Sequence, residues 1–269
     1  MRCKELATGK KKFRFKNKLF SFDATVIELC ASLYDWAKYR QTKGAVKLHL
    51  LLDHEGYLAV FAHVTGGKMH EVNVARSMFF PKGSIVVMDR GYVDYRLFSD
   101  WTERGVYFVT RMKDNARYRV IEEKEVPKRR NILKYEVIEF EGDKAREDCW
   151  YQLRRIEVWE EDKGERIVLL TNRHEFGATT IWAIYKDRWQ TEIFFKMIKQ
   201  NLKIKSIVGT SFNAVMIQIW TALISILVLR YLKFKSRYSW SLSNLVAMFL
   251  ILKMQKNLYK RLDLSRWFL

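Results

Sequence analysis

The sequence predicts an α/β protein with a mixed sheet covered by helices, an antiparallel β insertion, and further helices toward the C-terminal end. The first observation is that short apolar runs alternate with segments of helical spacing over residues 19–111. The second is a change to alternating apolar and polar positions between turns over residues 118–171. The third is a series of long helical patterns from residue 178 onward.

The first part of the chain predicts three strands, a short helix, a strand, a longer helix and a last strand, in that order. Asp53-His54-Glu55-Gly56 separates the second and third strands and is typical of a hairpin connection. The apolar run SIVVM predicts a strand buried on both faces. The seven segments are Leu19–Thr25, Val46–Leu52, Tyr57–Val64, His70–Ser77, Ser84–Met88, Tyr95–Arg104 and Val106–Arg111.

The second part of the chain predicts strands that alternate in polarity, followed by helices. The strands are expected over Lys134–Phe140, Trp150–Trp159 and Arg166–Leu170, and the helices over Ala178–Leu202, Phe212–Leu232 and Ser241–Leu262. The predicted division is a basic lead-in (1–18), an α/β domain (19–117 and 172–210), a β insertion (118–171) and a C-terminal helical region (211–269).

The net charge of +19 predicts a polyanionic partner, because a positive surface attracts phosphate and releases its counterions on binding. Nucleic acid is the leading candidate. Residues 121–166 carry 14 acids and 11 bases, so the positive excess lies elsewhere in the chain. The three cysteines, Cys3, Cys30 and Cys149, lack the spacing of a metal site and fit a reducing cytoplasm.

One stretch, Ala214–Leu229, has sixteen residues without a charge. A membrane span needs roughly 20 apolar residues, and Gln218, Thr221 and Ser225 dilute this run. We therefore expect a buried core helix and no membrane partner. A membrane anchor formed by the same stretch is the alternative.

Five polar residues form one stripe on the helix predicted from residue 178. Tyr185, Arg188, Glu192, Lys196 and Lys199 fall within an arc of about 80° when each residue advances the helix by about 100°. Most of the remaining circumference is apolar, so we expect the stripe to face a cleft. The alternative is a solvated face with ordinary i, i+4 ion pairs.

Two further acids, Asp23 and Asp89, lie at the ends of predicted strands. Transfer of a phosphodiester needs an activated nucleophile and a stabilised leaving oxygen, and two Mg²⁺ ions about 3.5–4 Å apart supply both. Mg²⁺ prefers carboxylate oxygen, so acids from separate elements must converge on it. We expect Asp23, Asp89 and Glu192 to hold two Mg²⁺ ions, for which Mn²⁺ would substitute.

These residues resemble the DDE transposases of bacterial insertion sequences, specifically the insertion-sequence-four family. The signature Y-x2-R-x3-E-x6-K of that family is matched by Tyr185, Arg188, Glu192 and Lys199. The resemblance extends over residues 14–205. It also includes the segments Asp23-Ala24-Thr25, Lys47-Leu48-His49 and Asp89-Arg90-Gly91-Tyr92.

The resemblance implies a ribonuclease-H-like fold, with the β insertion between the second aspartate and the glutamate. It implies metal-dependent DNA strand cleavage and strand transfer in cut-and-paste transposition, with Asp23, Asp89 and Glu192 as catalytic, metal-binding residues. The implied partners are double-stranded DNA, at transposon ends and target, and a second copy of the chain in a homodimer. The implied location is the cytoplasm, in association with the nucleoid.

The resemblance also implies contacts with DNA. Members of this branch pass through a DNA hairpin in which a flipped base stacks on an aromatic residue of the insertion. Trp150 and Trp159 are the candidates here, and Trp189 beside the stripe is a third aromatic candidate; plain packing is the alternative for each. The residues expected to contact phosphate are Tyr185, Arg188, Lys196, Lys199 and Arg90.

The chain departs from the family ahead of the first aspartate. Family members usually have a DNA-binding region there, whereas 22 residues precede Asp23, so we expect a truncated member that lacks most of that region. Two alternatives to an active transposase stay open. One is an inactive remnant that binds DNA through its charge, and the other is a nuclease that hydrolyses without joining.

Overall fold

The computed structural model describes residues 12–30, 34–40, 43–128, 131–201 and 209–235, together with Asn244, Ala247 and Met248. The chain has two compact units, one of Thr8–Phe195 and one of Met1–Ala7 with Lys196–Leu269. Apart from those three single residues, the helix predicted over Ser241–Leu262 lies outside the described residues, as do residues 1–11 of the basic lead-in.

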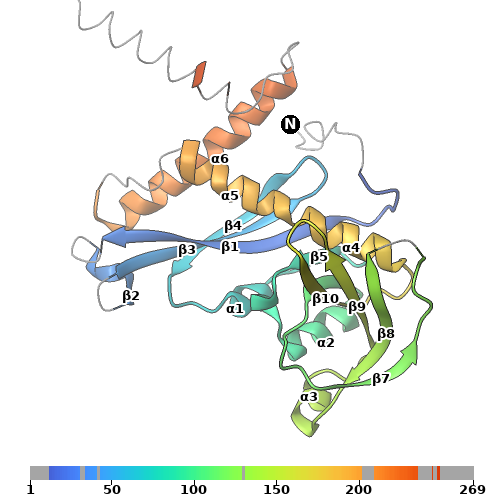
Figure 1. Ribbon diagram of the computed structural model, residues 1–269. Coiled ribbons are helices and arrows are strands. Elements are labelled where there is room, and N and C mark those ends of the chain that lie inside the picture. The colour runs from blue at the N-terminus through green and yellow to red at the C-terminus, as the bar shows by residue number, and fades with distance from the viewer. Residues whose placement is uncertain are drawn as a thin grey trace, which may run out of the picture. The chain divides into compact units, whose positions relative to one another are not determined.

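The larger unit is built on one ten-stranded mixed sheet (Figure 1). The strands run in the order β2-β3-β1-β5-β6-β10-β9-β8-β7, and β4 pairs with β3. The pairs β1–β5 and β5–β6 are parallel, and the other pairs are antiparallel. The strands are β1 (Leu19–Cys30), β2 (Lys38–Arg40), β3 (Lys43–Asp53), β4 (Leu58–Gly66), β5 (Ile85–Met88), β6 (Tyr107–Arg111), β7 (Tyr118–Glu123), β8 (Ile132–Phe140), β9 (Leu153–Glu160) and β10 (Glu165–Thr171).

Helices pack on both faces of the central strands. The α-helices are α1 (Glu71–Arg76), α2 (Tyr95–Glu103), α3 (Asp143–Asp148), α4 (Ala178–Asp187), α5 (Trp189–Asn201) and α6 (Phe212–Lys235), and the short 3-10 helices are η2 (Asp35–Ala37) and η3 (Arg90–Tyr92). Helix α2 begins at a true cap, because the Asp94 side chain accepts a hydrogen bond from the backbone N–H of Leu97.

Successive side chains of a strand point to opposite faces, and this alternation creates two separate cores. In β1, Phe20 and Phe22 join the core that contains α2, whereas Leu19 joins the core that contains α4. In β5, Val86 and Met88 take the α2 side, and Ile85 and Val87 take the α4 side. Continuation of the same alternation places Asp23 and Asp89 on the α4 face.

The strands of the predicted insertion extend the sheet. Strand β10 pairs with β6 in antiparallel fashion, so β9, β8 and β7 follow outward from the central strands. Two features of this segment were missed by the sequence pattern. Helix α3 occupies residues for which only a turn was predicted, and β7 was not distinguished as a strand. The division of the chain into a catalytic domain and an insertion stays a prediction.

The single helix predicted over Ala178–Leu202 is wrong, because the structure breaks it at Arg188 into α4 and α5. At the break, the backbone N–H of Arg188 donates to the carbonyl of Tyr185, and that of Thr191 donates to the carbonyl of Arg188. These three-residue steps tighten the chain at that point. Hydrophobic periodicity continues across the break and therefore does not reveal it.

The apolar residues of this helix are buried only in part. Trp189 is 51% exposed and Ile193 is 47% exposed, one turn apart on α5. Phe194 and Phe195 are buried as expected. The apolar side of α5 thus includes two residues, Trp189 and Ile193, that are exposed to solvent.

Helix α6, in the smaller unit, is long and apolar enough to cross a membrane by length and composition, with a mean hydropathy of 2.0. A core helix of a soluble protein meets the same criteria. The prediction of a buried core helix holds on one side of α6 only. Val215, Ile219 and Ile226 are buried, whereas Ile217 and Ile224 are exposed.

The core around α2 yields a stability prediction. Phe98 is fully buried and stacks on Phe108 with ring centroids 4.2 Å apart, so Phe98→Ala should lower the free energy of unfolding by about 3–5 kcal/mol. The matched control is Phe79→Ala, since Phe79 is 86% exposed and its loss should change stability by less than about 1 kcal/mol. Equal effects of the two substitutions in urea titrations would contradict the assigned core.

Candidate active site

Asp23 lies inside β1 and not at a strand end as predicted, whereas Asp89 directly follows β5, the parallel neighbour of β1. The pairing of β1 with β5 ends with Phe22 opposite Met88, and Asp23 and Asp89 are the next residues of the two segments. Both follow a side chain that enters the α2 core, and both therefore face α4. Neighbouring strands are about 4.8 Å apart, which brings the two carboxylates within strong electrostatic range of each other.

Arg188, at the break between α4 and α5, connects the third acid to the first. Its Nη1 donates to Oδ2 of Asp23 at 2.8 Å, and its Nη2 donates to Oε1 of Glu192 at 2.7 Å. The side chains of Arg188 and Asp23 are only 13% and 15% exposed. One guanidinium therefore holds a residue of β1 and a residue of α5 in a mostly buried position.

Electrostatics make the ionised form of Asp23 unfavourable. Burial raises the pKa of Asp23, which Arg188 and the backbone N–H of Ala24 partly offset; the charges of Asp89 and Glu192 raise it again, to about 6. The pKa of Arg188 is shifted by burial, which lowers it, but the surrounding acids outweigh this effect and the net shift is upward. The site thus concentrates negative charge around one buried cation.

Two tyrosines complete the walls of the site. Tyr185 is buried on α4, and its ring lies 5.6 Å from the Arg188 guanidinium. Tyr92 is buried beneath the acids: burial raises the pKa of its phenol, and the charge of Asp23 raises it further. Its hydroxyl has no hydrogen-bond partner among the described residues. The Tyr92 ring itself packs in the α2 core.

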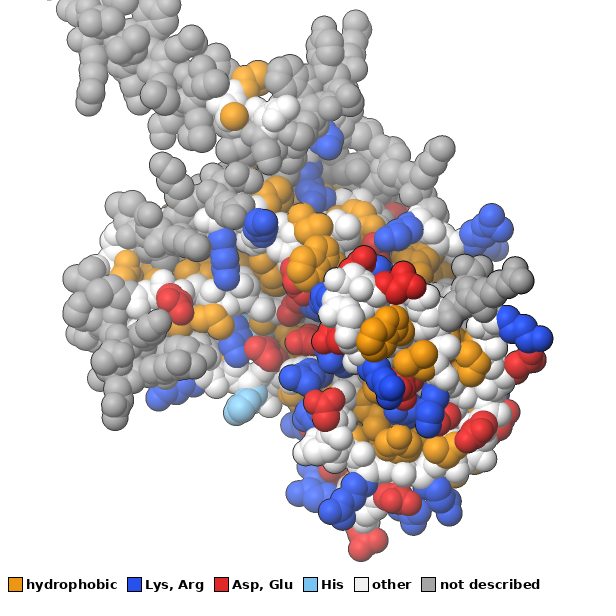
Figure 2. Space-filling model, viewed as in Figure 1, with side chains coloured by type: hydrophobic (Ala, Val, Ile, Leu, Met, Phe, Trp, Pro, Cys, Tyr) orange, Lys and Arg blue, Asp and Glu red, His pale blue; other side chains and the backbone are white. Residues whose placement is uncertain are grey.

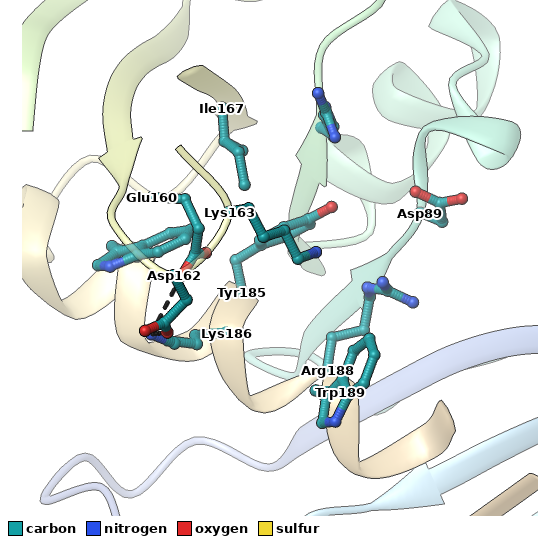
Figure 3. A pocket seen from close by; sticks show the side chains of 11 residues that line it. Asp89, Glu160, Asp162, Lys163, Ile167, Tyr185, Lys186, Arg188 and Trp189 are labelled. Carbon is teal, nitrogen blue, oxygen red and sulfur yellow. Dashed lines mark hydrogen bonds and ion pairs between the residues drawn. The ribbon is translucent and has the colours of Figure 1, made fainter. Parts of the chain in front are cut away.

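A pocket of about 330 Å³ opens beside Asp89 and Arg188 (Figure 3). Aromatic and basic side chains line it, together with the acids Glu160 and Asp162, which pair with Lys186. The lining residues are Asp89, Arg111, Glu160, Asp162, Lys163, Ile167, Trp182, Tyr185, Lys186, Arg188 and Trp189. The pocket combines flat apolar surfaces with cations, which are the features that bind an aromatic ring next to a phosphate.

The structure brings together some of the residues singled out by sequence and not others. Asp23, Glu192, Tyr185, Arg188, Asp89 and Trp189 belong to the acidic cluster or the pocket. Trp150 and Trp159 are exposed but do not line the pocket, and Arg90 pairs with Asp114 at 3.1 Å. Lys196 and Lys199 belong to the smaller unit, so their role stays a prediction.

Sequence reasoning missed several residues of this region. Trp182, Lys163 and Arg111 line the pocket, yet they come from a helix, a hairpin turn and a strand that share no sequence motif. Among the described residues on the face drawn in Figure 2, basic and acidic side chains are intermixed. The excess of positive charge in the composition therefore could not locate the pocket.

The three acids fit a divalent cation in donor type and in charge, because Mg²⁺ prefers carboxylate oxygen. Among the described residues, no three Asp, Glu, His or Cys side chains are close enough together to hold one ion in the present arrangement. Instead, the Arg188 guanidinium lies between Asp23 and Glu192 and neutralises them. The residue types therefore fit a divalent cation, whereas their present spacing, with Arg188 bound to two of them, does not.

Comparison with known proteins identifies the class. The family model for the transposase DDE domain matches residues 14–228, so the chain belongs to the DDE transposase family. Within that family, a putative transposase of Sinorhizobium fredii is 30% identical over 220 residues, covering 77% of this chain and 59% of the relative. A probable transposase of an insertion sequence element from Geobacillus stearothermophilus is 28% identical over 224 residues, covering 83% of this chain and 59% of the relative.

These relatives confirm the resemblance to transposases of bacterial insertion sequences, and the chain spans about 59% of the length of each of the two. A solved structure of the piggyBac transposase synaptic complex with hairpin DNA is similar in fold, with a TM-score of 0.51. It is 11% identical and covers 91% of this chain and 54% of that one. The predicted ribonuclease-H-like fold is confirmed.

The raised pKa of Asp23 predicts a pH-dependent stability. In the absence of metal, folded Asp23 takes up its proton near pH 6, whereas the unfolded residue does so near 3.8, so acidification between these values favours the folded state. This contribution is lost as the pH rises through about 6, and its size is at most about 3 kcal/mol. Asp23→Asn should therefore remove this rise from the curve of unfolding free energy against pH.

The control is Asp100→Asn, which changes an exposed acid of α2 and should keep the wild-type curve. Urea unfolding between pH 4 and pH 7.5, with a chelator present, measures all three proteins. Parallel curves for wild type and Asp23→Asn would contradict the assigned environment of Asp23.

Proposed function

We propose that this chain catalyses metal-dependent cleavage and strand transfer of double-stranded DNA, with Asp23, Asp89 and Glu192 as the catalytic carboxylates. One observation carries the proposal: Arg188 binds Asp23 and Glu192 at once, while Asp89 follows the strand paired with that of Asp23. Asp23 and Glu192, far apart in sequence, are thereby joined at one place, where Asp23 is mostly buried and the charges of Asp89 and Glu192 oppose its ionisation. Such a place is typical of a functional site rather than of a surface ion pair.

The three carboxylates would hold two Mg²⁺ ions, with Mn²⁺ able to substitute. When bound, such ions activate the attacking hydroxyl and stabilise the leaving oxygen of a phosphodiester. The residues of the chain contribute position and charge: Asp23 and Asp89 are fixed by the rigid strands, and Glu192 is presented from α5. Ionised Asp23 is needed for this role, so at subsaturating metal protonation of Asp23 below about pH 6 should compete with metal binding and lower activity.

Arg188 has two roles in this proposal. In the structure it neutralises Asp23 and Glu192, and a planar guanidinium with several donors is also suited to a phosphate oxygen. With the carboxylates bound to a divalent cation, Arg188 would be free to bind a phosphate oxygen of DNA, and Tyr185 would support it there. Arg90, Lys196 and Lys199 would contact phosphate further along the duplex. We also propose a homodimer acting on paired DNA ends in the cytoplasm, in association with the nucleoid.

The proposed role of Glu192 can be tested by substitution. Glu192→Gln should lower Mn²⁺- or Mg²⁺-dependent nicking and joining of DNA on the order of a thousandfold, because a catalytic carboxylate that acts with others as a unit is not replaced by an amide. Its effect on DNA binding should be small, since no positive charge is lost. The matched control is Glu123→Gln, on an exposed position of β7, which should cleave like wild type.

The outcomes separate the competing functions. Equal, metal-independent behaviour of wild type and Glu192→Gln would contradict catalysis and favour a protein that only binds DNA. Metal-dependent nicking without strand joining would indicate a nuclease. The proposed transposase activity requires both nicking and joining to depend on Glu192 and on the metal.

The pocket suggests which aromatic residue contacts DNA. Trp189 is half exposed, lines the pocket beside Asp89, and carries the Lys163 ammonium 5.7 Å from its ring centroid. Trp150 and Trp159 are exposed but lie outside the pocket lining. All three stay candidates for stacking on a base, and proximity to the acids favours Trp189.

A second prediction orders these tryptophans. Trp189→Ala should weaken binding of DNA that has an unpaired base by about 1–3 kcal/mol, the usual contribution of one base stacked on an aromatic ring. Trp150→Ala and Trp159→Ala should cost less. Fluorescence anisotropy with a labelled hairpin measures the three variants, and a larger loss for Trp150 or Trp159 would move the stacking position to the insertion.

A further inference from the structure

Asp187 is a buried carboxylate with an unusually complete set of donors. Its side chain has no exposed surface, and it accepts hydrogen bonds from Nδ1 of His54 at 2.6 Å and from the hydroxyl of Tyr57 at 3.0 Å. Lys12 adds an ion pair. An ionised carboxylate buried in this way is unfavourable unless it is paired. These contacts therefore stabilise the ionised form of Asp187.

The network continues from His54 to β1. Nε2 of His54 lies 2.6 Å from Oγ of Ser21, which is fully buried. Ionised Asp187 can only accept, so Nδ1 of His54 donates to it. In a neutral imidazole Nε2 then accepts from the hydroxyl of Ser21. Ser21 and Asp23 lie on the same face of the strand, two residues apart.

The hydrogen-bonded series Ser21–His54–Asp187 consists of the same residue types, connected in the same way, as the Ser-His-Asp triad of hydrolases. Ser21 lies within β1 with no exposed surface, so no substrate carbonyl can reach its hydroxyl. A nucleophilic role is therefore excluded by burial. The network has to be explained by what it holds in place.

Backbone strain marks the same network. Tyr57, at the hairpin between β3 and β4, has a φ of 53°, and it is the one non-glycine residue with positive φ in the part of the chain that the structure describes. A bulky aromatic residue adopts this conformation only where its surroundings impose it. Here the conformation accompanies the contact between its hydroxyl and Asp187.

Asp187 and Arg188 are consecutive residues, and their hydrogen bonds lead to two different residues of β1. Asp187 is attached through His54 to Ser21, and Arg188 is attached directly to Asp23 at 2.8 Å. These attachments coincide with the break between α4 and α5. Two adjacent attachments fix both the rotation of α4 about its axis and its position along β1.

We propose that Asp187 is a positioning residue, which the His54, Tyr57 and Lys12 side chains hold so that the neighbouring Arg188 is aimed at Asp23 and Glu192. The expected effect on activity rests on the proposed function, because the orientation of Arg188 affects a reaction rate only if Asp23 and Glu192 are catalytic. Supporting residues of a ligand set typically change affinity or activity by about 10–100-fold when they are replaced.

The test uses the full chain and the variant Asp187→Asn, which removes the charge at nearly constant size, with Asp100→Asn as the matched control. Protein labelled with ¹⁵N-arginine, without metal or DNA, should give a slowly exchanging guanidinium signal for Arg188, assigned by its loss in Arg188→Lys. Asp187→Asn should move or broaden this signal to that of a solvated arginine, and Asp100→Asn should leave it unchanged. An unchanged signal in folded Asp187→Asn would overturn the proposal.

Milder variants keep the test decisive if Asp187→Asn fails to fold. Tyr57→Phe removes one donor and should shift the Arg188 signal partially. An amide can donate from the place of Nδ1, so His54→Asn should keep more of the signal than His54→Leu. An Arg188 signal insensitive to both positions would overturn the proposal.

Activity gives an independent measure. The rate of Mn²⁺-dependent nicking, divided by the folded fraction, should fall about 10–100-fold in Asp187→Asn. A purely structural role would lower the folded fraction and leave the normalised rate at the wild-type value, which would contradict positioning. If wild type and Glu192→Gln are equally inactive, the proposed function fails, and the Arg188 signal still decides the present inference.

Discussion

The contact of one guanidinium with two carboxylates is the interaction on which the arrangement of this site depends. Arg188 binds Asp23 and Glu192 at 2.8 and 2.7 Å and thereby joins β1 to α5. Burial is the main cause of the raised pKa of Asp23, the charges of Asp89 and Glu192 add to it, and the Arg188 cation opposes it. The acids need a nearby positive charge, which Arg188 supplies in this structure. In the proposed function divalent cations would supply it instead.

The sheet supplies the other half of the site through simple geometry. Because side chains alternate along a strand, the residues that build the α2 core of β1 and β5 leave the next residues, Asp23 and Asp89, on the α4 face. The parallel register then places these two aspartates side by side. One regular feature of β structure therefore both builds the two cores and places the two proposed catalytic aspartates on the same face.

Local patterns predicted most strands, the helix α2 and the place of Asp89 after a buried strand, because these depend on the alternation and turns of neighbouring residues, whereas Asp23 lies inside β1 and not at a strand end. The break at Arg188 could not be predicted in this way, because it coincides with contacts of Asp187 and Arg188 to residues 133 and 165 positions away, His54 and Asp23 respectively. The exposure of Trp189 and the pocket formed with Trp182 and Lys163 likewise depend on how distant elements pack. The motif identified the family correctly, and it gave no information on which tertiary contacts orient its residues.

The most direct measurement is the anomalous diffraction of Mn²⁺ in crystals of the full chain soaked with the ion. The account predicts density between Asp23, Asp89 and Glu192, with at least one of the two carboxylate contacts of Arg188 broken in comparison with metal-free crystals. Density at another place, or both Arg188 contacts intact at saturating Mn²⁺, would contradict the claim that these three acids form the metal-binding centre.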